Sequence, residues 1–213
     1  MAFSITGRCR SRGRGDGLAT WHCPRLVLVD ILVFDGLDEM DAWGPAEVFR
    51  SAGKRGADIR TRLVTRLAQD TVLGAYGLRF IPDGVFEPGA ADVLVVAGGG
   101  WAARDVAGAW GEAQRGDLLP LLVQARRSTP LVAGVCTGTM LLAHAGIVGS
   151  RRASTHRTAG DDLQALGVPP RQTRRNRLGA IPGAGRACPW PPPADVLLGT
   201  GNWQRPVGES RHP

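Results

Sequence analysis

Three short runs of apolar, largely β-branched residues are the feature that most constrains the fold of this chain. The runs are LVLVDILVF at 26–34, DVLVVA at 92–97 and PLVAGV at 130–135. They lack the strict polar alternation of half-exposed strands, which is typical of strands buried on both faces of a parallel sheet. Segments with helical periodicity follow at 118–127 and 137–145. Strands that alternate with helices predict an α/β fold with a parallel sheet and right-handed crossovers.

Weaker signals complete this pattern. Residues 59–65 have the composition of a further strand, and 71–74 and 78–82 are predicted to form a small hairpin. Pro45 fits the first turn of a helix, because the N–H that proline lacks has no intrahelical partner there. Active sites of α/β proteins lie beyond the carboxyl ends of the strands, so we expect functional residues in the loops that follow them.

Composition divides the chain into three parts. Residues 1–25 show no hydrophobic periodicity and are predicted to be a disordered extension, whereas 26–168 carry the α/β domain. Residues 169–213 are dense in Pro, Gly and Arg, and only 194–198 resembles a strand. This abrupt change predicts a frameshift near codon 168, with the C-terminal part of the fold missing or garbled. Translating the gene in its other reading frames is the test.

The net charge of +7 comes from the two ends of the chain. Residues 1–26 and 169–213 together hold 12 of the 26 Lys and Arg but 3 of the 19 Asp and Glu. A nucleic-acid-binding surface is a basic face on a folded element, so this distribution argues against DNA or RNA binding. No apolar run approaches the roughly 18 residues of a membrane span. We therefore expect a soluble protein that binds neither nucleic acid nor membrane.

The cysteines indicate a reducing environment. They are Cys9, Cys23, Cys136 and Cys188, and no two have the short spacing of a zinc site or a CxxC redox motif. The N-terminus has no apolar stretch of the kind found in signal peptides. We predict free thiols, no metal and a cytoplasmic location.

Cys136 is the strongest functional candidate. It lies in GVCTGTMLLAHAG at 134–146, where a buried strand turns into an apolar helix among small residues. A sharp strand-to-helix turn exposes its central side chain, as in a nucleophile elbow. The free N–H groups of the helix N-terminus favour the thiolate, which is the nucleophilic form of cysteine. A buried structural cysteine is the alternative.

Other loops supply partners for this thiol. Gly98, Gly99 and Gly100 follow a buried strand, where they form either an oxyanion hole or a plain turn. Four acidic residues lie in or near the first loop: Asp38, Glu39, Asp41 and Glu47. A carboxyl group facing a thiolate tends to keep its proton and act as a general acid, and Asp41 is the best placed. Surface acids or a helix cap remain the alternative for all four.

Two polar residues near the elbow have open roles. Thr137 follows Cys136 and either donates its hydroxyl to substrate or caps the helix. His156 follows Ala153-Ser154-Thr155 and either reaches the site or makes structural hydrogen bonds.

Four motifs occur in an order that resembles the ThiJ/PfpI family of the class I glutamine amidotransferase-like superfamily. They are FDGLDEMDAWGPAEVF, DVLVVAGGG, VCTGTMLLAHAGIVGSRRASTH and DDLQALG. The resemblance runs from about residue 28 to 167. The Cys-Thr-Gly elbow and the Asp-x-x-Gly-Pro-x-Glu-Val-Phe loop look most like the isonitrile hydratase branch.

The resemblance implies a flavodoxin-like fold, a homodimer and a small-molecule substrate. It assigns the nucleophile to Cys136, its acidic partner to Asp41 and an essential neighbour to Thr137. It assigns an oxyanion loop to Gly99 and Gly100. The implied reaction is that of a hydro-lyase, which hydrates an isonitrile to an N-substituted formamide without metal or organic cofactor.

Two alternatives follow from the same resemblance. The domain also occurs as the ligand-sensing part of AraC-type transcriptional regulators, although no helix-turn-helix is recognisable here. Sibling hydrolases include deglycases, chaperones and proteases. The protease branch tends to place His directly after the nucleophile, a position that Thr137 occupies in this chain.

Overall fold

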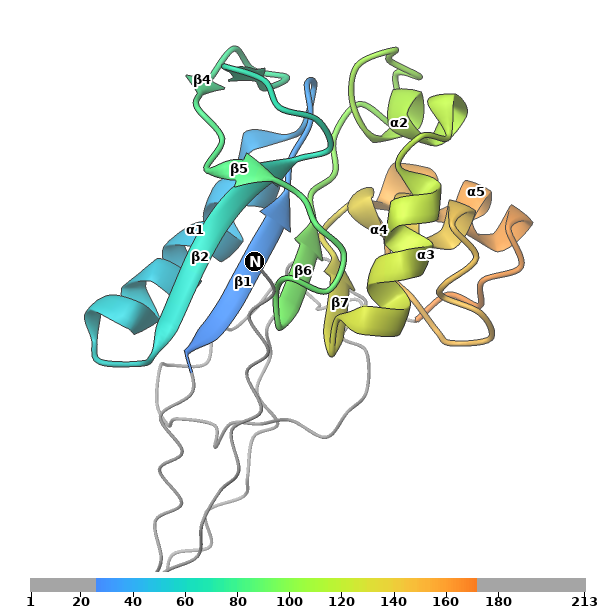
Figure 1. Cartoon of the computed structure of the whole chain (residues 1–213). Helices are drawn as coiled ribbons and strands as arrows, with labels where there is room; N and C mark the ends of the chain where they lie inside the picture. The colour runs from blue at the N-terminus through green and yellow to red at the C-terminus, as the bar shows by residue number, and fades with distance from the viewer. Residues whose placement is uncertain (1–25, 172–213) are drawn as a thin grey trace, which may run out of the picture.

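The 26–34 run forms β1 (Val27–Leu32), which lies in the middle of the sheet in the computed structural model of the chain (Figure 1). The structure describes residues 26–171. Five strands form the sheet in the order β5-β2-β1-β6-β7, and all neighbouring pairs are parallel. The other strands are β2 (Ile59–Thr65), β5 (Gly84–Val85), β6 (Val93–Val96) and β7 (Leu131–Gly134). The predicted parallel α/β fold is confirmed.

The strand register brings three loops to one edge of the sheet. Leu32 of β1 pairs with Val96 of β6, and Val96 pairs with Gly134 of β7. Because these strands are parallel, the chain leaves all of them at the same carboxyl edge. The loops that follow β1, β6 and β7 therefore lie side by side.

Helices cover both faces of the sheet. α1 (Glu39–Lys54) connects β1 to β2 and packs on these strands, behind the sheet in Figure 1. α3 (Leu119–Ser128) lies between β6 and β7 in the chain and in front of the sheet in the same view. The two connections run toward opposite edges, so right-handed crossovers place α1 and α3 on opposite faces. The remaining helical segments are α2 (Ala109–Arg115), α4 (Gly138–His144), α5 (Gly160–Ala165) and the 3-10 turn η1 (Arg157–Ala159).

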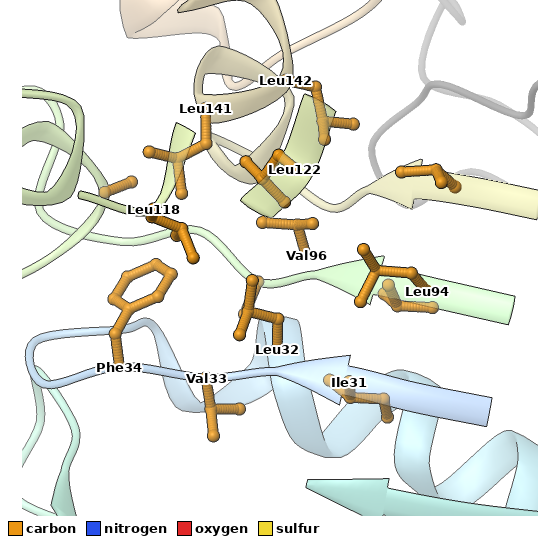
Figure 2. Packing of buried hydrophobic residues seen from close by; sticks show 14 of the residues in the cluster. Ile31, Leu32, Val33, Phe34, Leu94, Val96, Leu118, Leu122, Leu141 and Leu142 are labelled. Carbon is orange, nitrogen blue, oxygen red and sulfur yellow. The ribbon is translucent and has the colours of Figure 1, made fainter. Parts of the chain in front are cut away.

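Leucine and valine side chains fill the space between the sheet, α3 and α4. Figure 2 shows Leu118, Leu122 and Leu141 gathered near Val96 and Leu32, all within one buried cluster. Burying a side chain of this size contributes about 1.5–3 kcal/mol relative to leaving it in water. The cluster therefore fixes α4 against the sheet, together with the loop that precedes it.

A two-stranded hairpin stands outside the main sheet. β3 (Val72–Leu73) pairs antiparallel with β4 (Arg79–Phe80), and Val72 lies opposite Phe80. In Figure 1 the hairpin lies beyond the carboxyl ends of β1 and β2. The prediction of a hairpin in this segment is confirmed.

The start of α1 differs from the prediction. The helix begins at Glu39, so Pro45 lies inside it and not in its first turn. The reason is the side chain of Asp38, which accepts the N–H of Met40 at 3.1 Å and caps the helix N-terminus. Because proline has no N–H, the carbonyl of Asp41 lacks its usual intrahelical donor.

The described chain continues slightly past the predicted domain boundary at 168. Ala153 donates its N–H to Pro169 at 3.1 Å, and its carbonyl accepts the N–H of Arg171 at 2.8 Å. The predictions for the N-terminal extension, the strand-like stretch at 194–198 and the garbled C-terminus lie outside the described residues. Within 26–171, none of the helices combines the length and the apolar character needed to cross a bilayer.

Candidate active site

Cys136 occupies a sharp bend between β7 and α4. Its φ is +52°, in the left-handed region that residues with a Cβ rarely adopt. Flanking glycines make the bend possible. A Cβ on Gly134 would lie 2.6 Å from the nitrogen of Thr139, and one on Gly138 would overlap the carbonyl oxygen of Val96. This is the geometry of a nucleophile elbow, with a half-buried thiol at the carboxyl edge of the sheet.

The positive φ of Cys136 leads to a prediction about stability. Replacing Cys136 by Gly removes the Cβ that disfavours this conformation, whereas Ala keeps it. We expect Cys136→Gly to be more stable than Cys136→Ala by about 0.5–1 kcal/mol, after allowing for the greater chain entropy of unfolded Gly. Urea unfolding of the two variants measures the difference. A more stable Ala variant would show that the bend is not strained.

Asp41, in the first turn of α1, faces the Cys136 thiol. The two side chains share a hydrogen bond, and the backbone N–H of Gly98 also donates to the Asp41 carboxylate. The backbone N–H of Thr137 donates to the sulfur of Cys136. Oxygen Oδ2 of Asp41 is buried without a hydrogen-bond partner in the described part of the chain. The helix after β1 and the loops after β6 and β7 thus each contribute to one site.

Burial raises the pKa of both groups in this pair. The pKa of Asp41 rises from 3.8 to about 6, first through burial and then through the charge of Asp38. Burial, followed by the charge of Asp41, raises the pKa of Cys136 from 9.0 to about 12, and the Thr137 N–H opposes this only in part. The pair therefore holds one proton between about pH 6 and pH 12.

This protonation state differs from the prediction. We expected a resting thiolate beside a protonated Asp41, whereas the pKa values describe a Cys136 thiol that donates to an ionised carboxylate. The physical reason is burial, which disfavours the thiolate by more than the neighbouring N–H group restores. Asp41 is consequently placed to take the proton from the thiol.

The glycine loop after β6 packs against the elbow. The N–H of Gly99 donates to the hydroxyl of Thr137 at 2.8 Å, and a Cβ on Gly98 would lie 2.7 Å from the same oxygen. A Cβ on Gly100 would lie 2.8 Å from the carbonyl oxygen of Ala107. The Gly99 N–H that we expected to face an oxyanion is therefore engaged by Thr137 in this conformation.

The segment between α4 and α5 returns to the site. The hydroxyl of Thr155 donates to the carbonyl of Cys136 at 3.2 Å, which supports the bend. The exposed ring of His156 lines the space beside Cys136, and its Nδ1 lies 2.8 Å from the hydroxyl oxygen of Thr158. Nothing in the local sequence around Thr155 predicts this contact with the elbow, which joins residues 19 positions apart.

A cleft of about 650 Å³ opens beside the Cys136–Asp41 pair. Its lining residues come from four segments of the chain: Asp38, Glu39, Met40, Asp41, Tyr76, Leu78, Cys136 and His156. Within 26–171, no group of three or more His, Cys, Asp or Glu side chains has the arrangement of a metal site.

The four acidic candidates of the first loop have different positions. Asp38 caps α1, and the buried Glu39 accepts hydrogen bonds from the hairpin. Glu47 is exposed on the third turn of α1. Asp41 is the one whose carboxylate is hydrogen-bonded to the sulfur of Cys136.

A model of the DJ-1/PfpI family matches residues 27–169, about two thirds of the chain. This chain belongs to the DJ-1/PfpI family. The matched range contains every residue that lines the cleft. The predicted resemblance to this family and the flavodoxin-like fold are confirmed.

Three known proteins illustrate what this chain is similar to. An uncharacterized protein encoded in the cpoL 5' region of Streptomyces lividans is 38% identical over 130 residues, which cover 60% of this chain and 86% of that protein. The isonitrile hydratase of Pseudomonas putida is 29% identical over 154 residues, which cover 72% of this chain and 62% of the hydratase. The crystal structure of a ThiJ/PfpI family protein from Pseudomonas syringae superposes with a TM-score of 0.61 at 23% identity, covering 76% of this chain and 64% of that one.

Proposed function

We propose that this protein is a cysteine-dependent isonitrile hydratase, a hydro-lyase that adds water to an isonitrile and releases an N-substituted formamide. The observation that carries the proposal is the hydrogen-bonded Cys136–Asp41 pair at the wall of an open cleft. The similarity to a protein named isonitrile hydratase supports the choice of reaction, although the alignment covers less than two thirds of that enzyme.

The first step forms a thioimidate. The sulfur of Cys136 attacks the terminal carbon of R–N≡C while its proton passes to the carboxylate of Asp41. Asp41 then returns this proton to the same carbon, which gives R–N=CH–S–Cys136. No atom is lost in this step, and the proton that was shared by the pair ends on the substrate carbon. The Thr137 N–H that donates to the sulfur stabilises its negative charge during the attack.

The second step releases the product. Water adds to the thioimidate carbon while Asp41 takes one of its protons as a general base. Asp41 passes this proton to the nitrogen. The new hydroxyl group then gives its proton to Asp41 as the carbon–sulfur bond breaks, and Asp41 returns it to the sulfur as R–NH–CHO leaves. The scheme uses neither a metal nor an organic cofactor. Thr137 positions the glycine loop through its hydrogen bond with Gly99. For Gly99 and Gly100 to act as an oxyanion hole, the Gly99 N–H must leave the Thr137 hydroxyl and donate to the substrate instead.

Formamide production from cyclohexyl isonitrile tests this function. We expect turnover by the wild type and by Cys188→Ala, which controls for the loss of a thiol elsewhere, and none by Cys136→Ala. The expected loss is at least about 10³-fold, because a residual rate without the nucleophile depends on binding alone. Unchanged turnover by Cys136→Ala would refute the mechanism.

The ligand-sensing domain of an AraC-type regulator is a second candidate. An AraC family transcriptional regulator from Pseudomonas putida supports it, since its crystal structure shares this fold with a TM-score of 0.53 at 21% identity. This candidate is supported if the wild type binds the isonitrile without forming any formamide. A deglycase-like or protease-like hydrolase is tested with aldehyde adducts and with peptides as substrates.

We further propose a cytoplasmic homodimer as the working form of the enzyme.

A further inference from the structure

The hairpin of β3 and β4 is attached along the loop that leads into α1. The N–H of Leu73 donates to the carboxylate of Asp35 at 2.9 Å, and the carbonyl of Leu73 accepts the N–H of Gly36 at 2.8 Å. One residue beyond Gly74, the N–H of Ala75 donates to the carbonyl of Leu37 at 2.8 Å. These hydrogen bonds hold the tip of the hairpin beside the catalytic pair.

Glu39 extends this attachment to the cleft. Its Oε1 accepts the N–H groups of Tyr76 and Leu78 at 2.8 and 3.2 Å, and the carboxylate fills the space where a Cβ of Gly74 would lie. Farther along, the ring of Trp43 meets that of Phe80 edge-on at 5.7 Å. The tip is therefore a preformed wall, so binding a ligand there costs little ordering entropy.

The wall and the first turn of α1 present apolar side chains to the cleft. Met40 is 72% exposed, Tyr76 83% and Leu78 44%, and all three line the same cleft as Cys136. Large apolar side chains gathered at the mouth of one cleft mark a binding surface more often than isolated ones do. The floor of the cleft is polar, since it carries the thiol and carboxylate of the catalytic pair.

We propose that Met40, Tyr76 and Leu78 form an apolar rim that binds the substituent of the substrate, so that the preferred substrates are isonitriles with a bulky apolar group. This inference rests on the proposed function and specifies its substrate class. An isonitrile is linear through its substituent, nitrogen and carbon. When its terminal carbon meets the sulfur of Cys136, the substituent consequently points away from the floor of the cleft and toward the rim.

The charge of the cleft adds a second selection. Asp38, Glu39 and Asp41 line it, and among the described lining residues none is Lys or Arg. Three carboxyl groups without a lining cation give the cleft a negative potential, in line with the upward effect of Asp38 on the pKa of Asp41. An anionic substituent is therefore disfavoured relative to a neutral one of the same size.

Product binding tests the rim separately from the chemistry. The probes are N-cyclohexylformamide and N-methylformamide, titrated calorimetrically into the full-length Cys136→Ala protein. We expect the cyclohexyl compound to bind about tenfold tighter or more, because the larger substituent buries more apolar surface. Adding Tyr76→Ser or Leu78→Ser is expected to remove most of this preference. Ile81→Ser is the matched control, since Ile81 is 78% exposed on the same segment but does not line the cleft.

The outcomes separate this inference from the proposed function. Equal affinity for the two formamides, or equal effects of Ile81→Ser and Tyr76→Ser, would overturn the rim. A cyclohexyl preference without any isonitrile turnover by the wild type would support the rim and refute the hydratase. If Tyr76→Ser and Leu78→Ser change the sedimentation coefficient of the protein but not the preference, the surface binds a second copy and the proposal is wrong.

Discussion

Replacing Asp41 by Asn is expected to lower kcat/KM for isonitrile hydration by about 10²–10⁴, the usual range for loss of a general acid–base group. The amide is nearly isosteric with the carboxyl group and still accepts the N–H of Gly98. It cannot take the proton of the Cys136 thiol, however, and the raised pKa of that thiol makes spontaneous ionisation rare at neutral pH. The attack of sulfur on substrate therefore loses its base.

The pH dependence follows from the pKa of about 6 for Asp41. In the wild type, the rate should rise with pH through about 6 as the carboxylate becomes able to accept a proton. The Asn variant should lack this limb. Glu47→Gln is the matched control, because it makes the same change of charge at an exposed position of the same helix. A rate limb near pH 6 that persists in the Asn variant would assign it to another group.

The same substitution should increase stability. The pKa of Asp41 is higher in the folded protein, about 6, than the ordinary value of 3.8, so the folded state holds this proton more tightly. The resulting stabilisation is complete below about pH 4 and is lost as the pH rises through about 6. At pH 7 the buried charge costs about 3 kcal/mol, which Asn avoids. Urea unfolding at pH 4 and pH 7 should therefore show a gain for the Asn variant at pH 7 only.

The strands were predictable because their signals are local. The apolar runs around Ile31, Val95 and Val132 belong to strands that need no partner sequence to be recognised. β5 and α2 were not predicted. A strand of two residues such as β5 exists only through its pairing with Val64 and Thr65. The cap that starts α1 is also local, because Asp38 accepts the N–H of Met40, but Pro45 offered a competing start signal.

The site was predictable in composition but not in protonation. Cys136 and Asp41 meet because parallel strands end at one edge, a rule that needs the topology alone. Their pKa values depend on how much water the surrounding loops exclude, which no local pattern records. The hydrogen bond from Gly99 to Thr137 joins residues 38 positions apart, so the sequence could not predict it either. Long-range contacts of this kind decide how a recognisable set of residues works.

Gly138→Ala is expected to destabilise the fold by about 3 kcal/mol, a large part of the roughly 5–15 kcal/mol that stabilises a typical domain. A Cβ at this position would overlap the carbonyl oxygen of Val96 and lie 2.7 Å from that of Ala97. The Val96 carbonyl cannot turn away freely, because it accepts the N–H of Val135 at 2.9 Å. The strain would be relieved only by moving α4 away from β6.

Such a movement would also displace the elbow, so Gly138→Ala should lose turnover even at temperatures where it stays folded. Gly160→Ala is the control, because Gly160 has helical dihedral angles of −61° and −45° and no atom lies within 4 Å of the added Cβ. That variant should be neutral or more stable by about 0.5–1 kcal/mol, as expected for Ala in place of Gly in a helix. Urea unfolding followed by circular dichroism measures both. Equal stability of the two variants would mean that α4 is free to shift away from β6. The close packing of Gly138 against β6 would then not be what holds Cys136 in place.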